Sequence, residues 1–128
     1  MDTDELIAAQ IAYYRARAGQ YDDEPRHANN DLRWPEYLEH LQADVAELDV
    51  WLAADPPTGH VLEIAAGSGN RTDWLLRSAD RVTAVDAAPE MLELLRGKHP
   101  GVECIVADIF SWVPPQRFDN IFFGYWIS

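Results

Sequence analysis

The sequence is poor in several features that mark whole classes of protein. It contains one cysteine, Cys104, so no disulfide can form within the chain, and its place in an apolar run is typical of a buried thiol. The 128 residues carry only 10 lysines and arginines against 22 aspartates and glutamates, a formal net charge of −12. Because phosphate backbones and anionic membranes attract basic surfaces, this balance argues against free nucleic acid or a membrane as a partner.

Targeting and metal-binding signals are also missing. No apolar run approaches the ~18 residues that a membrane-spanning helix needs, and the first residues are acidic where a secretory signal is basic. Together with the single cysteine, these absences predict a cytoplasmic protein. The histidines show no metal-ligand spacing and predict surface or linker positions: His27, His40, His60 and His99.

The N-terminal part carries two helical patterns. Apolar residues recur every three or four positions over residues 4–18, which predicts an amphipathic helix. Residues 19–35 are polar and aperiodic, which indicates an ordered loop or a lid. A second helix is expected after Pro35 and should end before the Pro-rich breaker at residues 55–59. We expect residues 1–58 to form an N-terminal helical cap or lid.

The remaining residues, 59–128, change to short apolar strands that alternate with short helices. This alternation is typical of βαβ units around a parallel sheet, so an open α/β core is expected here. The expected strands cover residues 61–65, 81–85, 102–107 and 118–123, and the expected helices cover residues 71–78 and 89–98.

A glycine loop follows the first of these strands. Gly67 and Gly69 stand between the strand and the next helical pattern, where the chain must turn tightly and where a ligand could approach a backbone without Cβ atoms. Alone, this pattern is equally consistent with an ordinary strand-to-helix turn. It becomes more informative when it is read with the acids that accompany it.

Three acids lie in or at the ends of successive strands. Asp86 follows Glu63 by 23 residues, and Asp108 follows Asp86 by 22. The carboxyl ends of strands in an open α/β sheet share one crevice, so Asp86 and Asp108 can face the glycine loop. Asp86 could accept hydrogen bonds from ribose hydroxyls, and Asp108 from an adenine amino group. For both, the alternatives are a helix cap or a solvated loop acid.

The loop also limits which nucleotide it could bind. It lacks the Gly-Lys-Ser/Thr ending of a phosphate-binding ATPase loop. Thr72 stands where a dinucleotide-binding loop has a small third residue, which argues against NAD. Glu63 would repel a pyrophosphate, but it suits a cationic ligand.

Four segments in order resemble the motifs of class I S-adenosylmethionine-dependent methyltransferases. They are Val61-Leu-Glu-Ile-Ala-Ala-Gly-Ser-Gly69, Val82-Thr-Ala-Val-Asp-Ala-Ala-Pro-Glu-Met-Leu92, Val106-Ala-Asp-Ile-Phe110 and Phe118-Asp-Asn-Ile-Phe-Phe-Gly-Tyr-Trp126. The segment from Tyr13 to Asp22 also resembles the cap of the small-molecule enzymes in that family.

The resemblance implies S-adenosyl-L-methionine as cofactor, a small-molecule methyl acceptor and a set of cofactor contacts. Glu63 and the backbone from Ala65 to Gly69 would hold the methionine end, and Asp86 the ribose. Tyr14 has an equally good alternative as part of a buried helix face. The implied contacts are Tyr14, Tyr21, Glu63, Ala65, Gly67, Gly69, Asp86, Ala87, Met91, Asp108, Ile109 and Phe110.

The resemblance also implies a seven-stranded sheet, of which this chain carries four strands. We therefore expect a Rossmann-like open parallel sheet with flanking helices, truncated after the fourth strand and preceded by the helical cap. Strand 118–123 would then be an exposed apolar edge, which favours homodimerisation or aggregation through it unless the N-terminal helices fold back over it. No catalytic base is evident, and Tyr125 and Trp126 are candidates for acceptor contact.

Three functions remain open on these residues. The first is a small-molecule methyltransferase, with little or no turnover expected from this chain alone because the implied acceptor pocket lies largely beyond it. The second is a cofactor-binding fragment or interaction module without turnover. The third is a nicotinamide-dependent oxidoreductase, which Glu63 and Thr72 disfavour.

Overall fold

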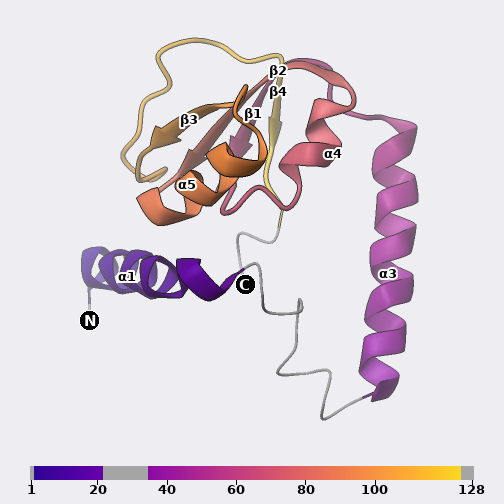
Figure 1. Ribbon diagram of the computed structural model, residues 1–128, viewed down its shortest axis with the longest axis horizontal. Helices are drawn as coiled ribbons and strands as arrows, with labels where there is room; N and C mark the ends of the chain where they lie inside the picture. The colour runs from indigo at the N-terminus through magenta and orange to yellow at the C-terminus, as the bar shows by residue number, and fades with distance from the viewer. Residues whose placement is uncertain (1, 22–34, 125–128) are drawn as a thin grey trace. The chain divides into compact units, whose positions relative to one another are not determined.

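The computed structural model describes residues 2–21 and 35–124, which divide into two compact units. One unit combines residues 1–21 with residues 57–128, and the other is residues 22–56. Helix α1 (Thr3–Tyr21) belongs to the first unit together with the sheet, whereas helix α3 (Pro35–Ala54) lies in the second (Figure 1). The boundary at residue 58 between a cap and a core stays a prediction.

The first unit is built on an open sheet of four parallel strands in the order β3-β2-β1-β4. Because β2 and β3 lie on one side of β1 and β4 lies on the other, the chain reverses direction across the sheet at β1. Such a reversal is where ligands bind in open α/β sheets. The strands are β1 (Gly59–Ile64), β2 (Ala79–Asp86), β3 (Glu103–Val106) and β4 (Asn120–Phe122).

Helices α4 (Thr72–Leu76) and α5 (Pro89–Lys98) cover one face of this sheet (Figure 1). Pro89 suits the first position of α5, where the missing N–H needs no partner, and basic residues occupy its last turn. The apolar side chains of both helices meet those of the strands in one core. This core includes Val61, Leu75, Val82, Ala84, Leu92 and Leu95.

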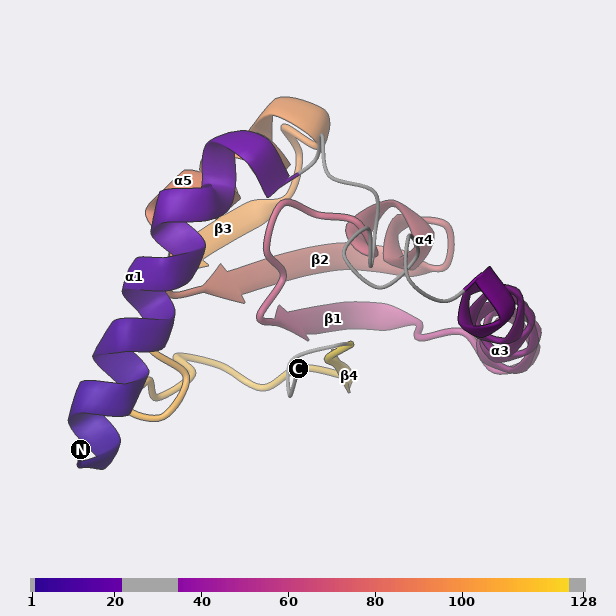
Figure 2. The ribbon, with the colours of Figure 1, turned by 90° about the horizontal axis from the view of Figure 1, so that it is seen from below.

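Helix α1 packs beside α5, and Figure 2 shows it passing near the ends towards which the β1 and β2 arrows point. It begins with a capping box, in which Asp2 and Glu5 each bind the other's backbone N–H. Buried Ala18 packs with Ala88 and Met91 at the start of α5. Arg15 donates three hydrogen bonds to the Glu90 carboxylate at 3.0–3.2 Å. The predicted helix over residues 4–18 is confirmed and continues to Tyr21, because Gly19 weakens a helix without ending it.

The sheet confirms the expected open α/β core, although several elements are shorter than predicted. Strand β3 starts one residue late because the Val102 N–H turns back to the His99 carbonyl at 3.1 Å. Just before β4 begins at Asn120, the Asp119 N–H donates to the His60 carbonyl at 2.9 Å, but the His60 N–H is bound by the Asp119 carboxylate at 2.7 Å and not by a backbone carbonyl. Within the described residues, no helix is long and apolar enough to cross a membrane.

Candidate functional site

The glycine loop leaves β1 through three residues with left-handed backbone angles. Ala65, Gly67 and Gly69 have φ values of 52°, 57° and 89°. An added Cβ on Gly69 would lie 2.9 Å from Cγ of Leu95, whereas one on Gly67 would meet nothing within 4 Å. Gly69 therefore lets the loop pack on α5, and Gly67 borders open space where a ligand could approach. Ala65 adopts this conformation despite its Cβ, and such strain gathers at functional sites.

Glu63 is the buried acid of the site, with 3% of its surface exposed. It shares a face of β1 with Val61, because side chains alternate along a strand, and this face meets α4. The Thr72 hydroxyl at the start of α4 donates to Oε2 of Glu63 at 2.5 Å, a length typical of a bond to a carboxylate. The sequence therefore places a carboxylate where apolar side chains surround it on the core side of the sheet.

The electrostatics at Glu63 favour a cation. Burial raises the pKa of Glu63 to about 7, and the negative charges of Asp73 and Asp86 add to this rise, while the Thr72 hydrogen bond opposes it. None of these groups is basic. A positively charged ligand group at this place would therefore stabilise the ionised carboxylate.

Asp86, at the end of β2, is tied to the glycine loop. Its Oδ2 accepts the Gly67 N–H at 2.9 Å, and its Oδ1 accepts the Ala88 N–H at 2.8 Å. Burial raises the pKa of Asp86, and the backbone N–H groups oppose the rise. Each carboxylate oxygen has a further lone pair, so the same group can still accept hydroxyls. Asp86 is not the N-cap of α5, because that position is Ala88, which makes no side-chain cap bond.

Asp108 lies in the turn that follows β3. Its Oδ1 accepts the Phe110 N–H at 3.0 Å, and its carbonyl accepts the Ser111 and Trp112 N–H groups at 3.1 and 2.8 Å. The Ala107 N–H extends the ladder to the Asp86 carbonyl at 3.0 Å, which keeps this turn beside β2. Phe110 is 64% exposed. The Asp108 carboxylate thus shapes its own turn, and its predicted contact with adenine stays a prediction, as do those of half-buried Ile109 and of Phe110.

Residues of α1 and of the start of α5 form a small cluster near the carboxyl ends of β1 and β2. Met91 and Ala88 are 1% exposed and pack with Ala18, and the Tyr14 side chain lies against them. Tyr14 thus occupies the buried helix face that was its alternative interpretation, while its role over the cofactor stays a prediction. The same holds for Met91 and for Ala87, which is half-buried.

Two predicted residues, Tyr125 and Trp126, fall outside what the structure describes. Tyr21 is described only as the last residue of α1. Thr72 is not among the contacts predicted from the sequence, where it served only as evidence against an NAD-binding loop. A hydroxyl in the first helical turn, nine residues after a strand acid, was the available signal.

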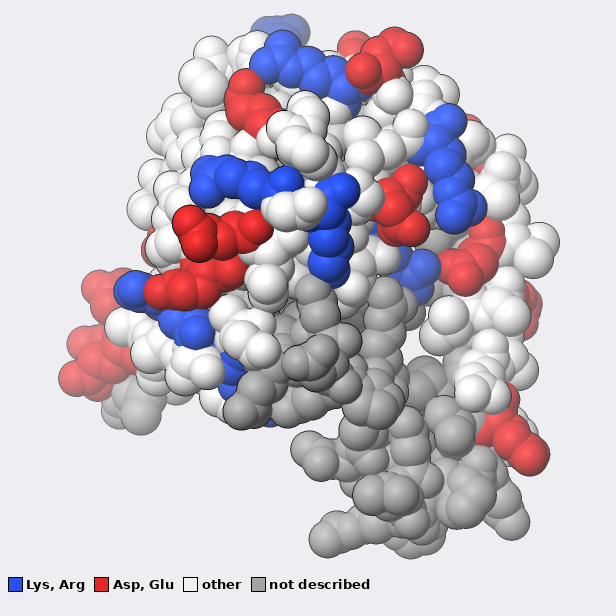
Figure 3. All heavy atoms as spheres, in the orientation of Figure 1, with Lys and Arg blue, Asp and Glu red and all other residues white. Residues whose placement is uncertain are grey.

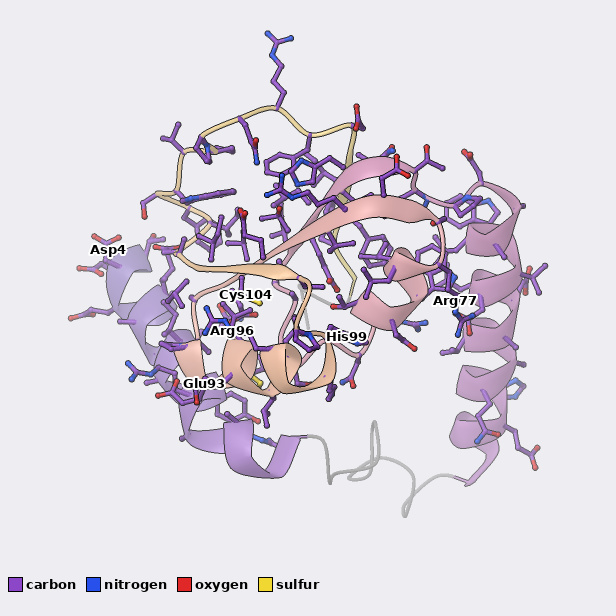
Figure 4. The ribbon with its side chains drawn as sticks, turned by 45° about the horizontal axis from the view of Figure 1, so that its top comes forward. Asp4, Arg77, Glu93, Arg96, His99 and Cys104 are labelled. Atoms are coloured by element: carbon purple, nitrogen blue, oxygen red, sulfur yellow. The ribbon has the colours of Figure 1, made fainter. Side chains whose placement is uncertain are left out.

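The described residues contain no group of three or more histidines, cysteines or acids that could hold a metal. Cys104 is half-buried, and Figure 4 shows it on β3 near Arg96 of α5, whose Nη2 donates to the Cys104 carbonyl at 3.4 Å. Burial raises the pKa of this thiol. On the face seen in Figure 3, basic and acidic side chains are interspersed among the described residues.

Comparison with known proteins gives consistent results. A protein family described as "Methyltransferase domain" matches residues 61–127. The trans-aconitate 2-methyltransferase of Escherichia coli is 32% identical over 93 residues, which cover 69% of this chain and 37% of that protein.

Two solved structures are similar in fold. A structure described as a DhpI-SAH complex has a TM-score of 0.73 and 37% identity, over 98% of this chain and 56% of that one. SAM-bound CalS10, an amino pentose methyltransferase from Micromonospora echinaspora, has a TM-score of 0.53 and 29% identity, over 65% of this chain and 34% of that one. The chain thus spans between about a third and a little over half the length of these relatives.

Proposed function

The chain belongs to the methyltransferase domain family, and from that premise we propose that it binds S-adenosylmethionine for methyl transfer to a small-molecule acceptor. The proposed site is the carboxyl edge of β1 and β2. The observation that carries this proposal is a buried carboxylate, Glu63, held beside a glycine loop with open space at Gly67.

The residues at this edge suit the cofactor part by part. Glu63 would attract the ammonium group of the methionine end, because burial and the nearby charges of Asp73 and Asp86 raise its pKa and a cation would offset them. The Gly67 backbone leaves room for close approach. Asp86 would accept the ribose hydroxyls through the lone pairs that Gly67 and Ala88 leave free. Asp108, with Phe110 beside it, would lie at the adenine.

When bound, S-adenosylmethionine supplies a methyl group on a positively charged sulfur. The chain's own contribution is to hold the two ends of the ligand, because positioning and exclusion of water supply much of the rate in such a displacement. A dedicated base is unnecessary for a good nucleophile. Tyr125 and Trp126 stay candidates for acceptor contact.

The acceptor class is supported by the similar proteins. Trans-aconitate is a small carboxylic acid, and the CalS10 acceptor is described as an amino pentose. Both names point to small molecules rather than to nucleic acid or protein. We propose the same class for this chain, in a cytoplasmic setting that its single cysteine favours.

The other candidate is cofactor binding without turnover, because the described groups at this edge, Glu63, Gly67 and Asp86, account for cofactor contacts and not for contacts with an acceptor. The two candidates differ in what they do with an acceptor. Methyl transfer from S-adenosylmethionine with a labelled methyl group should be assayed against a panel of small carboxylic acids and amino sugars. This chain and any longer product of the same reading frame should be assayed side by side.

Transfer that depends on one acceptor and is lost in Asp86→Ala would support the enzyme. Cofactor binding without transfer in either protein would favour the binding module. Absence of both binding and transfer would reject the proposed function.

A further inference from the structure

Thr72 is the one polar side chain of the first turn of α4 that is fully buried, at 0% exposure. A buried hydroxyl needs a hydrogen-bond partner, and here the partner is Oε2 of Glu63 at 2.5 Å. The bond joins two buried groups, since Glu63 itself is only 3% exposed. A carboxylate can accept about four, so Glu63 retains acceptor capacity after Thr72 has bound it.

The groups around Glu63 make the Thr72 hydrogen bond important. Asp73 on α4 and Asp86 at the end of β2 both oppose its ionisation, and burial opposes it further. Cys104 on β3 also interacts electrostatically with Glu63, and it contributes no positive charge. The hydrogen bond from the Thr72 hydroxyl acts in the opposite direction and favours the carboxylate form of Glu63.

We propose that Thr72 is a positioning residue for the cofactor: its hydroxyl fixes the buried Glu63 carboxylate as the acceptor for the ammonium group. This inference rests on the proposed function. It explains why this loop has a threonine at the position where a dinucleotide-binding loop has a small residue. The pair Glu63–Thr72 would select a ligand with a positive amino-acid end over one with a pyrophosphate.

The test uses two adenosyl ligands that differ in the amino-acid end, where Glu63 would act. S-adenosylhomocysteine carries the ammonium group, and 5′-methylthioadenosine keeps the adenosine and the sulfur but lacks the amino-acid end. Calorimetric titration of the whole chain with each ligand is compared for the wild type, Thr72→Val and Thr72→Ser. Valine keeps the shape and removes the hydroxyl, and serine restores the hydroxyl without the methyl group.

Thr72→Val should weaken S-adenosylhomocysteine binding by about tenfold or more, the loss typical of a bond to a charged group. It should leave methylthioadenosine binding within about twofold, and Thr72→Ser should recover most of the loss. The pH at which S-adenosylhomocysteine affinity falls should also move upward in the valine variant. Without the hydroxyl, the pKa of Glu63 rises further above about 7, and the ligand's own amine titrates identically in every arm.

The possible failures are distinct. If the wild type binds neither ligand, the proposed function fails and the inference fails with it. If the wild type binds both, and Thr72→Val either binds S-adenosylhomocysteine with unchanged affinity and pH profile or weakens both ligands equally, the positioning role is overturned while the proposed function stands. A Thr72→Val protein that does not fold leaves Thr72→Ser as the test, which then must bind both ligands like the wild type.

Discussion

The carboxyl edge of the sheet is built differently on its two sides. At the ends of β1 and β2, Glu63 is buried and bonded to Thr72, and Asp86 is bonded to the Gly67 backbone. At the end of β3 and along β4, Phe110 and Ile121 are 64% and 60% exposed. The first side consists of central strands, whereas β3 and β4 are the edges of this sheet.

The difference shows which part of the site the fold assembles without a ligand. Central strands receive neighbours on both sides and helices on one face, so the groups at their ends are fixed by packing. Groups at edge strands depend on partners such as a ligand or another strand. We therefore expect substitutions on the β1–β2 side to affect folding and binding together, and those on the β3–β4 side to affect mainly binding or association.

The largest effect is expected at Gly69. Gly69→Ala should lower the free energy of unfolding by about 2–4 kcal/mol, because an alanine is strained at φ 89° and its Cβ would press on buried Leu95. Gly67→Ala is the matched control, with a positive φ but open space, and should cost about 1–2 kcal/mol. Urea denaturation of both variants measures the difference. Equal losses would show that the contact with Leu95 is unimportant.

The next effect is a pH dependence from Glu63. Its pKa is raised from 4.5 to about 7 in the folded state, so folding binds a proton between these values and the Glu63 contribution to stability is lost as pH rises through them. This loss should reach roughly 3 kcal/mol by pH 8 in the ligand-free protein. Glu63→Gln should flatten the profile in that window. Parallel profiles for wild type and variant in denaturant titrations would contradict the raised pKa.

Substitutions of Asp86 and Asp108 compare cofactor binding on the β1–β2 side with that on the β3 side. Asp86→Ala should weaken S-adenosylhomocysteine binding by roughly 1.5–3 kcal/mol, the range for hydrogen bonds to a charged group. Asp108→Ala should cost less, about 1 kcal/mol, because its carboxylate is part of an exposed turn. Calorimetry at one pH compares both with the wild type. An unchanged affinity in Asp86→Ala would make Asp86 a structural residue of the loop.

The smallest effect on stability is expected on β4. Ile121→Lys should change the unfolding free energy by about 0.5 kcal/mol or less, because this side chain is 60% exposed. It should reduce any self-association, since an inserted lysine discourages strand pairing at a sheet edge. Sedimentation over a range of protein concentrations tests the predicted homodimer. A wild type that stays monomeric throughout would remove the basis for pairing through β4.

Local patterns predicted the sheet and its helices well. The alternation of short apolar strands with helices gave the parallel core, and Gly67 and Gly69 marked the turn that the left-handed angles later required. Strand ends were less predictable, because they depend on side chains from distant segments. Asp119, for example, binds the His60 backbone just before β4 begins.

The site was predictable in its acids but not in their partners. Glu63 and Asp86 could be found from strand position and from resemblance to a family. The hydroxyl that binds Glu63 and the backbone groups that bind Asp86 follow from how α4 and the loop pack on the sheet. Such contacts join residues nine and nineteen positions apart through a turn, which no periodicity records.

Thermal unfolding at pH 8 tests the central claim most directly, with S-adenosylhomocysteine and NADH compared at equal concentrations. A ligand that binds only the folded state stabilises it by about 2.7 kcal/mol at a concentration of 100 times its Kd. We predict that S-adenosylhomocysteine raises the melting temperature in a concentration-dependent way and that NADH leaves it unchanged. A rise with NADH alone would contradict the assignment of the β1–β2 edge to an adenosyl ligand with a cationic end.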